Sequence, residues 1–348
     1  MKVFLTGGTG FIGQNLVRAL RRRGWSVDAL VRDPEAAPAR WLGAQGCRLV
    51  RGDVTGADDL AEAMRGADVV IHNVGVYELG AGRRERERMQ TVNVQGTDKV
   101  LGAALAAGVP RAVHVSTVWA LGSSGPDAER AADESKRHDG RYLTAYERSK
   151  AEAHQIALRW RARGLPLVIA MPNGVVGAND HSIFGYFLRL YLMGLMPPLA
   201  WGREMVCALV DVDALAEGLA LAAEKAPVGE DYLFCGPPQS MGAMFGHWAR
   251  HPGGMRPRLW LPRALMRAQF VFMEPLLHAL GLPAFLSRDA VDCTRANLNY
   301  SSAKARRELG WQHPGAAEMW DRIVGQQRAL LAARRGWRQR LRHQAVTA

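Results

Sequence analysis

The first thirteen residues constrain the fold more than any other part of the sequence. The run from Lys2 to Thr6 is apolar enough to form a strand, and it leads directly into the glycine-rich stretch TGGTGFIG. Gly7, Gly10 and Gly13 have the spacing GxxGxxG, which permits a tight turn and a close approach of the backbone to a ligand. The start of the next helix would offer free N–H groups and the positive end of a helix dipole. We therefore expect a βαβ unit that binds the pyrophosphate of a dinucleotide, and a plain βα turn is the alternative.

Alternating patterns in the rest of the first half predict a parallel sheet. Short apolar, β-branched runs alternate with longer Ala- and Leu-rich runs, as in βαβ units. We expect strands at residues 2–6, 26–31, 47–51, 67–72, 111–116 and 167–171, and helices at residues 10–23, 57–64, 92–107 and 146–163. The predicted fold class is therefore α/β, a doubly wound parallel Rossmann sheet followed by a smaller C-terminal substrate lobe. In such a sheet the ligand crevice lies at the carboxyl ends of the strands.

The regular alternation fades after residue 172, which suggests how the chain is divided. We expect a Rossmann domain at 1–172, whose core extends to about residue 235 with interleaved segments, a substrate-binding lobe at 173–332 and a basic tail at 333–348. Apolar or amphipathic helices are expected at 184–199, 255–286 and 319–333. We expect most of the lobe's large apolar side chains to be core and a minority to face substrate; they are Phe184, Tyr186, Phe187, Leu192, Met193, Met196, Trp201, Trp260, Met266, Phe270, Phe272 and Met273.

Composition narrows the class of protein. The N-terminus lacks the apolar stretch and cleavage site of a secretory signal, which favours a cytoplasmic protein. No apolar run reaches the roughly 20 residues needed to span a bilayer. The cysteines form no CxxC pair, so we expect no metal site and reduced, mostly buried thiols; they are Cys47, Cys207, Cys235 and Cys293.

The charge is strongly basic, with a formal net charge of +12. A solvated, arginine-rich surface is the favoured interpretation, and no nucleic-acid partner is expected. The tail carries Trp337 among arginines. We expect a solvated terminal helix there, with peripheral contact to an anionic membrane as the alternative.

The end of the second predicted strand bears on the choice of cofactor. Arg32 and Asp33 lie about 20 residues after the glycine turn, where a Rossmann protein contacts the adenosine ribose. An acid at this place favours NAD, and an arginine favours NADP. Because Arg32 comes first, we expect NADP to be preferred, with NAD as the alternative.

A tyrosine and a lysine indicate acid–base chemistry. Tyr146 and Lys150 are four residues apart at the start of a predicted helix, so they share one face. A tyrosine with a pKa of about 10 exchanges protons poorly at neutral pH, and a nearby ammonium is expected to lower that pKa. Upstream, a predicted strand ends in Ser116 and Thr117. Either hydroxyl could bond a substrate oxygen, or both could satisfy backbone groups at the strand end.

The order of these motifs resembles that of extended short-chain dehydrogenases/reductases, the NAD-dependent epimerase/dehydratase superfamily. The motifs are TGGTGFIG, GDV at 52–54, NVQGT at 93–97, STVWALG at 116–122, YERSK at 146–150 and PNGVVG at 172–177. The sequence is most similar to the dihydroflavonol-reductase-like branch, which includes hopanoid-associated sugar epimerase-like proteins. The resemblance covers residues 1–235 well and the remainder loosely.

This resemblance implies site residues. Thr117, selected over Ser116 by alignment on Gly122, would form the catalytic set with Tyr146 and Lys150. Asn93 and Ser116 would support it. The implied cofactor residues are Gly7, Thr9, Gly10, Phe11, Ile12, Gly13, Arg32, Asp53, Val54, Asn73, Val74, Tyr146, Lys150 and Pro172. The sequence departs from the family in having Thr where Ser is commoner, and His-Asn-Val-Gly at 72–75 where His-Val-Ala-Ala is more usual. Homodimers through the helices at 92–107 and 146–163 are a further implication.

The implied activity is NAD(P)-dependent interconversion of a ketone and a secondary alcohol. Hydride would pass from the nicotinamide and a proton from Tyr146. The apolar lobe favours a bulky small-molecule substrate, sterol-, terpenoid- or flavonoid-like. One alternative is a nucleotide-sugar epimerase or dehydratase with tightly held NAD, for which Arg189 or Arg203 could bind the diphosphate. The other is a catalytically silent NADP-binding regulatory protein, against which the intact catalytic set argues.

Overall fold

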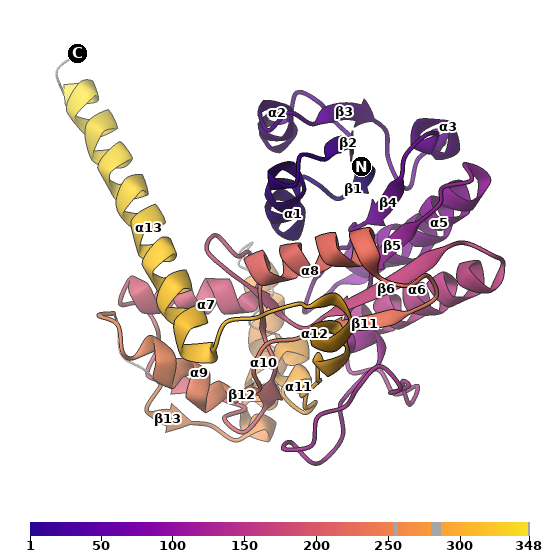
Figure 1. The fold of residues 1–348 in the computed structure, drawn as a ribbon. Helices are drawn as coiled ribbons and strands as arrows, with labels where there is room; N and C mark the ends of the chain where they lie inside the picture. Colours follow the sequence, from indigo (N-terminus) through magenta and orange to yellow (C-terminus); the bar gives the residue numbers. More distant parts are fainter. Residues whose placement is uncertain (254–256, 280–286, 347–348) are drawn as a thin grey trace.

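A single seven-stranded parallel sheet forms the centre of the computed structural model, which describes residues 1–253, 257–279 and 287–346 (Figure 1). The strand order is β11-β6-β5-β4-β1-β2-β3. The bounds are β1 Lys2–Thr6, β2 Ser26–Val31, β3 Arg48–Arg51, β4 Val69–His72, β5 Ala112–Val115, β6 Leu167–Pro172 and β11 Asp231–Phe234. This doubly wound Rossmann sheet confirms the predicted fold class.

The chain winds outward from the centre of the sheet in both directions. It runs from β1 through β2 to β3, then crosses to β4 on the other side of β1. Thr6 on β1 lies opposite His72 on β4, so these two strands end together. The reversal of strand order between them is where such a sheet forms its ligand crevice.

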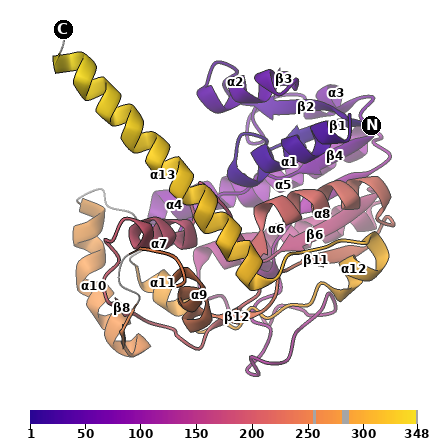
Figure 2. The same cartoon turned by 60° about the vertical axis from the view of Figure 1, so that its left-hand side comes forward.

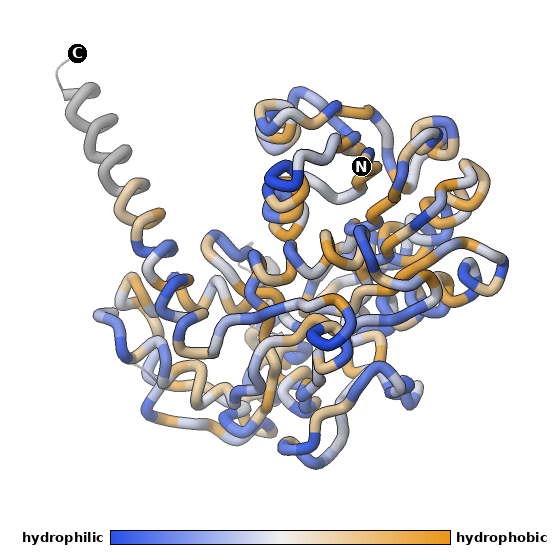
Figure 3. Tube along the Cα trace, viewed as in Figure 1, coloured by the Kyte–Doolittle hydropathy of each residue, from blue (hydrophilic) through white to orange (hydrophobic). Residues whose placement is uncertain are grey.

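Helices cover both faces of the sheet (Figures 1 and 2). The helix α1 packs on α8, and α5 packs on both α3 and α6. Side chains alternate along each strand, so Phe4 belongs to one core, whereas Val3 and Leu5 belong to the other. In Figure 3 the hydrophobic segments concentrate in the central strands and on the inner faces of these helices. Their bounds are α1 Phe11–Arg22, α2 Ala37–Ala44, α3 Leu60–Met64, α4 Arg83–Met89, α5 Gly96–Ala106, α6 Ala145–Ala162 and α8 Val212–Lys225.

Four elements of the sheet and its covering helices differ from the prediction. The helices α2 and α4 were not expected: α2 is short, and α4 has the sequence RRERERM, which lacks an apolar stripe. The expected helix at 92–107 is regular only from Gly96, because the six preceding residues, Gln90–Gln95, form a π-helix. The seventh strand, β11, was also missed as a strand, and at four residues it is shorter than most.

The second lobe is assembled from short helices and two-residue strands. The helix α7 ends at Leu192, not at residue 199 as expected, because Gly194 adopts a φ of 74° and two prolines follow. The expected helix at 255–286 begins only at Arg263, and residues 255, 256 and 280–286 of it lie outside the described part of the chain. The elements are β7 Val175–Val176, α7 Ile183–Leu192, β8 Leu199–Ala200, β9 Val206–Cys207, β10 Val210–Asp211, β12 Gln239–Ser240, α9 Met241–Trp248, β13 Leu259–Trp260, α10 Arg263–Ala279, α11 Arg288–Cys293 and α12 Ala303–Leu309.

The last helix, α13 Ala316–Val346, starts against the second lobe and extends away from the body (Figures 1 and 2). Met319, Trp320, Ile323 and Val324 are buried, and Trp320 meets Trp248 of α9 edge to face. The helix passes residue 333 without a break, although the tail side chains from 334 onward, Trp337 included, lie outside the described side chains. The division into domains at 172 and 332 stays a prediction. Within the described residues, no helix is long and apolar enough to cross a membrane.

Candidate active site

The glycine turn between β1 and α1 has a geometry that only glycine satisfies at two positions. Gly7 has a φ of 75°, and a Cβ there would lie 2.5 Å from the carbonyl oxygen of Asn73. A Cβ on Gly13 would lie 2.1 Å from the Gly7 oxygen. No side chain caps α1, whose first turn also lacks an acidic residue. The turn therefore presents bare backbone and the positive end of a helix, which fits a pyrophosphate.

A cleft of about 420 Å³ opens at the carboxyl ends of the central strands. It contains the predicted catalytic set and most of the predicted cofactor residues; those lining it are Gly7, Gly10, Phe11, Ile12, Asn73, Val74, Ser116, Thr117, Tyr146, Lys150 and Pro172. Six other expected residues do not line it: Thr9, Gly13, Arg32, Asp53, Val54 and Asn93. Gly13 packs inside the turn, and Val54 is buried against Gly96.

Arg32 and Asp53 lie beyond the cleft, at the ends of β2 and β3. The carboxylate of Asp53 accepts hydrogen bonds of 2.9 Å from the backbone N–H and the hydroxyl of Thr55. Burial raises the pKa of Asp53, but these bonds and the charges of Arg32 and Lys99 outweigh it, so the net shift is downward. Asp33 accepts the N–H of Glu35. Arg32 is thus exposed and lies near Asp53, whereas the Asp33 carboxylate is hydrogen-bonded within its own loop.

A capping box fixes the start of α6. The Thr144 hydroxyl accepts the Glu147 N–H at 3.1 Å, and the Glu147 carboxylate accepts the Leu143 N–H at 2.6 Å. Tyr146 and Lys150 follow within the first turns, so this cap sets where they point. The Lys150 ammonium donates to the Val115 carbonyl at 3.2 Å and is 5% exposed. Its burial lowers the pKa of Lys150 to about 8.

The pKa of Tyr146 moves opposite to the sequence prediction. Burial raises the pKa of Tyr146 to about 12, although a hydrogen bond with Thr117 lowers it in part. The expected lowering by Lys150 was therefore wrong for this arrangement, because removing the phenol from water disfavours phenolate.

The two strand-end hydroxyls point to different partners. Thr117 donates to the Pro172 carbonyl at 3.3 Å, and its hydroxyl lies near enough to the Tyr146 phenol to lower the pKa of Tyr146 in part. The Ser116 hydroxyl lies 3.1 Å from Nδ1 of His154 on α6. The geometry thus brings Thr117, rather than Ser116, against the phenol.

Asn93 lies behind the cleft and ties three elements together. Its side chain accepts the Val76 N–H at 2.7 Å and donates to the Val76 carbonyl at 2.9 Å and to the Ser149 hydroxyl at 3.0 Å. It is therefore placed to hold the loop after β4 against α6, in a positioning role.

No sequence motif marks Tyr77, which lies beside Tyr146. Its ring meets the Tyr146 ring edge to face, with centroids 4.7 Å apart. Tyr77 follows His72-Asn73-Val74-Gly75 on a loop without a motif of its own, so only the tertiary structure reveals its position.

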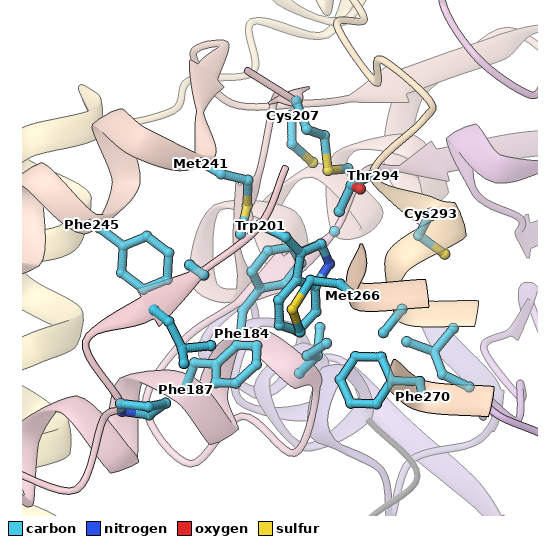
Figure 4. Close-up of a pocket in the computed structure, with 18 of the residues that line it drawn as sticks. Phe184, Phe187, Trp201, Cys207, Met241, Phe245, Met266, Phe270, Cys293 and Thr294 are labelled. Atoms are coloured by element: carbon cyan, nitrogen blue, oxygen red, sulfur yellow. The ribbon is translucent and has the colours of Figure 1, made fainter. Parts of the chain in front are cut away.

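A second cavity, of about 240 Å³, adjoins the cleft. Tyr77, Trp119, Gly174 and Phe184 line both cavities, so they form the boundary between them. Figure 4 shows Phe184 and Phe187, Met241 and Phe245, and Met266 and Phe270 gathered around Trp201. Along its described lining, this cavity has no lysine, arginine, aspartate or glutamate. We call it the apolar pocket.

Seven of the twelve predicted apolar residues line this pocket: Phe184, Phe187, Met196, Trp201, Met266, Phe270 and Met273. The same side chains pack in or against the hydrophobic cores, which confirms that most of the twelve are core; how many of them face substrate stays a prediction. Phe272 does neither and is 82% exposed.

The basic residues considered for a sugar diphosphate lie elsewhere. Arg189 bonds the Asp180 carbonyl from within α7. Arg203 lies over the Trp260 ring, 5.9 Å from its centroid. Neither is among the described residues that line the cleft or the apolar pocket.

Comparisons with known proteins bear on the family. Residues 3–235 match the model of the NAD dependent epimerase/dehydratase family. A Stigmatella aurantiaca protein named 4-hydroxy-2-methyl-3-oxo-4-farnesyl-3,4-dihydroquinoline-1-oxide ketoreductase is 33% identical over 89% of this chain and 92% of its own length. Sterol demethylase protein B of Methylococcus capsulatus is 30% identical over 89% and 93%. The crystal structure of gox2253 is 29% identical over 94% and 98%, with a TM-score of 0.77.

These matches confirm the family that the motifs predicted. The family model covers more than half of the chain, and the similar proteins extend through the second lobe. The chain therefore belongs to the NAD-dependent epimerase/dehydratase family, as an NAD(P)-dependent dehydrogenase/reductase of the extended short-chain type.

Proposed function

We propose that this protein reduces the ketone of a bulky apolar substrate to a secondary alcohol, with NADP as the preferred cofactor. The observation that carries the proposal is that two cavities adjoin: a polar cleft with Thr117, Tyr146 and Lys150 shares four lining residues with an apolar pocket. A ketone could place its oxygen among the hydroxyls and its carbon skeleton against the aromatic and methionine side chains. Relatives named for a farnesyl-dihydroquinoline oxide and for a sterol support a large apolar substrate.

The residues present fit a dinucleotide. The bare turn at Gly7 and Gly13 would hold the pyrophosphate, and Arg32 would meet a ribose 2′-phosphate. Lys150 would bond the nicotinamide ribose. When bound, the nicotinamide supplies the hydride.

Side chains of the protein would donate the proton and stabilise the charges that form. A Tyr146 phenol with a pKa of about 12 stays protonated at neutral pH, so it is a proton donor there. Thr117 would donate a second hydrogen bond to the ketone oxygen and so stabilise the negative charge that develops on it. Lys150, with a pKa of about 8, is mainly charged at pH 7 and would stabilise the phenolate left behind.

The alternatives are less well supported. A nucleotide sugar carries a diphosphate, and the pocket next to the catalytic residues offers it no cationic side chain along its described lining. A silent NADP-binding protein would have no need to gather Thr117, Tyr146 and Lys150 in one cleft or for the capping box that positions Tyr146.

Cofactor choice is tested by fluorescence titration with NADPH and NADH. Wild type should bind NADPH more tightly, and Arg32→Ala should lose most of that preference. Arg306→Ala, at an exposed position on α12, is the matched control and should change nothing. Equal affinity for both cofactors in the wild type, or a preference that survives Arg32→Ala, would refute the role of Arg32.

Turnover is tested with bulky apolar ketones and NADPH. Tyr146→Phe should lower kcat by at least about 100-fold while leaving NADPH affinity intact. Phe270→Asp should raise KM for an apolar ketone through the unpaired charge placed in the pocket. Wild type that turns over nucleotide sugars and no ketone would contradict the proposal.

A further inference from the structure

The loop after β4 carries Tyr77 to the junction of the two cavities. Four residues line both the polar cleft and the apolar pocket, and three of them are aromatic: Tyr77, Trp119, Gly174 and Phe184. The Tyr77 ring also meets the Tyr146 ring edge to face, with centroids 4.7 Å apart. Rings at this separation are in contact, so no part of a substrate fits between them. A ketone that extends from the apolar pocket to the Tyr146 phenol therefore has to pass beside Tyr77.

Hydrogen bonds hold this loop on both sides of Tyr77. Before it, the Asn93 side chain accepts the Val76 N–H at 2.7 Å and donates to the Val76 carbonyl at 2.9 Å. After it, the Gly80 N–H donates to the Asp289 carboxylate at 2.9 Å. Asn93 precedes α5, which packs beside the sheet, whereas Asp289 belongs to α11 of the second lobe. The loop is thus anchored to both parts of the molecule, and these anchors fix the place of the Tyr77 backbone.

The Tyr77 side chain is a wall of the cavities more than a part of the core. It is 40% exposed, and it is not among the described residues that form the hydrophobic cores or pack against them. Gly174, by contrast, is closely surrounded: a Cβ there would lie 2.7 Å from Cδ2 of Leu209 and 3.3 Å from Cε2 of Phe184. Truncation of Tyr77 should therefore widen the junction at little cost to the folded core.

A wall at this place acts on the carbons next to the carbonyl. An oxygen that is hydrogen-bonded to the Tyr146 phenol brings the carbonyl carbon and its two neighbours close to that ring, and so close to Tyr77. A methylene group beside the carbonyl occupies little space there, whereas a branched carbon would collide with the Tyr77 ring. Bulk farther along the skeleton lies in the apolar pocket, where aromatic and methionine side chains accommodate it.

We propose that Tyr77 is a specificity-determining residue, whose ring admits ketones that carry their bulk away from the carbonyl and rejects ketones that are branched beside it. Asp289 would act through Gly80 as a positioning residue for the same ring. The inference rests on the proposed function for the identity of the reacting group, whereas the selection is a property of binding and can be measured without turnover.

Two isomeric ketones test the selection, because they differ only in where the bulk lies. In 4-tert-butylcyclohexanone the branched group is remote from the carbonyl, and in 2-tert-butylcyclohexanone it is on the neighbouring carbon. Binding of each ketone to the full chain with NADP is followed by tryptophan fluorescence, and reduction by the consumption of NADPH. We expect wild type to bind the unhindered isomer more tightly and to reduce it with the higher kcat/KM.

Variants separate the ring from its surroundings. Tyr77→Ala should lower the preference for the unhindered isomer at least about tenfold, mainly through a gain for the hindered one. Tyr77→Phe keeps the ring and should keep the preference. Tyr142→Ala is the matched control, because Tyr142 is 38% exposed and is not among the described residues that line either cavity. Asp289→Ala should also lower the preference, and Asp289→Asn, which keeps an acceptor for the Gly80 N–H, should retain most of it.

The results that would overturn the proposal are distinct. A preference that survives Tyr77→Ala refutes it, as does wild type that binds neither isomer or both equally. An equal fall in Tyr77→Phe would assign the effect to the hydroxyl instead of the ring, and an equal fall in Tyr142→Ala would show that the effect is not local. Binding that discriminates between the isomers without reduction of either supports the role of Tyr77 and counts against the proposed function alone. Thermal unfolding and NADPH titration of the same samples verify that each variant is folded.

Discussion

Replacing Lys150 with methionine should stabilise the protein at neutral pH while abolishing turnover. Methionine has nearly the same length and no charge, so it fills the same buried space on α6. The wild-type ammonium is 5% exposed, and burial lowers the pKa of Lys150 from 10.5 to about 8. A buried lysine held this way carries a stability cost that an apolar residue does not.

The magnitude follows from the pKa shift. A folded pKa below the unfolded one means that the unfolded chain binds the proton more tightly, so the charge costs about 3 kcal/mol at pH 7. The hydrogen bond from Lys150 to the Val115 carbonyl stabilises the folded state by about 1.5 kcal/mol, and methionine cannot form it. We therefore expect Lys150→Met to be more stable than wild type by about 1–2 kcal/mol at pH 7. The cost falls as pH rises from about 8 toward 10.5, and at about pH 9.5 the variant should have lost its advantage.

Urea unfolding at the two pH values measures this difference. The control is Lys225→Met at the exposed end of α8, where the ammonium stays in water and the effect should not depend on pH. Lys150→Met that is less stable than wild type at pH 7, by the same amount as at about pH 9.5, would refute the reasoning, because it would mean that the buried ammonium is favourably paired.

Three further outcomes follow from the site. Gly13→Ala places a Cβ 2.1 Å from the Gly7 oxygen, so it should cost about 1–3 kcal/mol in urea unfolding and weaken NADPH binding at least about tenfold in titration. Asn93→Ala removes the hydrogen bonds to Val76 and Ser149, so thermal unfolding should show a free energy of unfolding lower by about 2–4 kcal/mol. Asn93→Asp keeps the oxygen that accepts the Val76 N–H, so its free energy of unfolding should fall by less. Ketone reduction followed across pH should decline above about pH 8 as Lys150 loses its proton, and a rate constant that stays flat to about pH 10 would contradict this.

The parts of the site that are encoded locally could be predicted from the sequence. The glycine turn needs only a strand, three glycines and a helix in succession, and the Tyr146–Lys150 pair needs only helical spacing. Both motifs lie where they were expected, since β1 ends at Thr6 and α6 begins at Ala145. The choice of Thr117 over Ser116 came from family resemblance and stays a prediction; the structure adds that the Ser116 hydroxyl lies 3.1 Å from Nδ1 of His154, whereas Thr117 influences the pKa of Tyr146.

The parts that depend on distant contacts could not be predicted. Tyr77 meets Tyr146 from a loop about 70 residues away in sequence, and no local pattern marks it. The raised pKa of Tyr146 reflects burial, which is set by the packing of both lobes. The apolar composition of the second lobe can be read from the sequence. Which apolar residues of a helix are exposed and which line the pocket depends on the elements that pack against that helix. Phe270 and Phe272, two residues apart, show this, because one is buried and the other almost fully exposed.

The two pKa shifts together bear on the proton-transfer step of the proposed reduction. Burial moves both groups toward neutrality: the pKa of Tyr146 rises to about 12, and that of Lys150 falls to about 8. A phenol in this state is a poor base for abstracting the proton of an alcohol but a ready donor to an oxygen that gains charge. Lys150 stays mainly charged at pH 7, so it could stabilise the phenolate that the donation leaves behind. The same desolvation that makes Lys150 costly to bury thus also keeps the Tyr146 phenol protonated at neutral pH, in the form that the proposed proton donation requires.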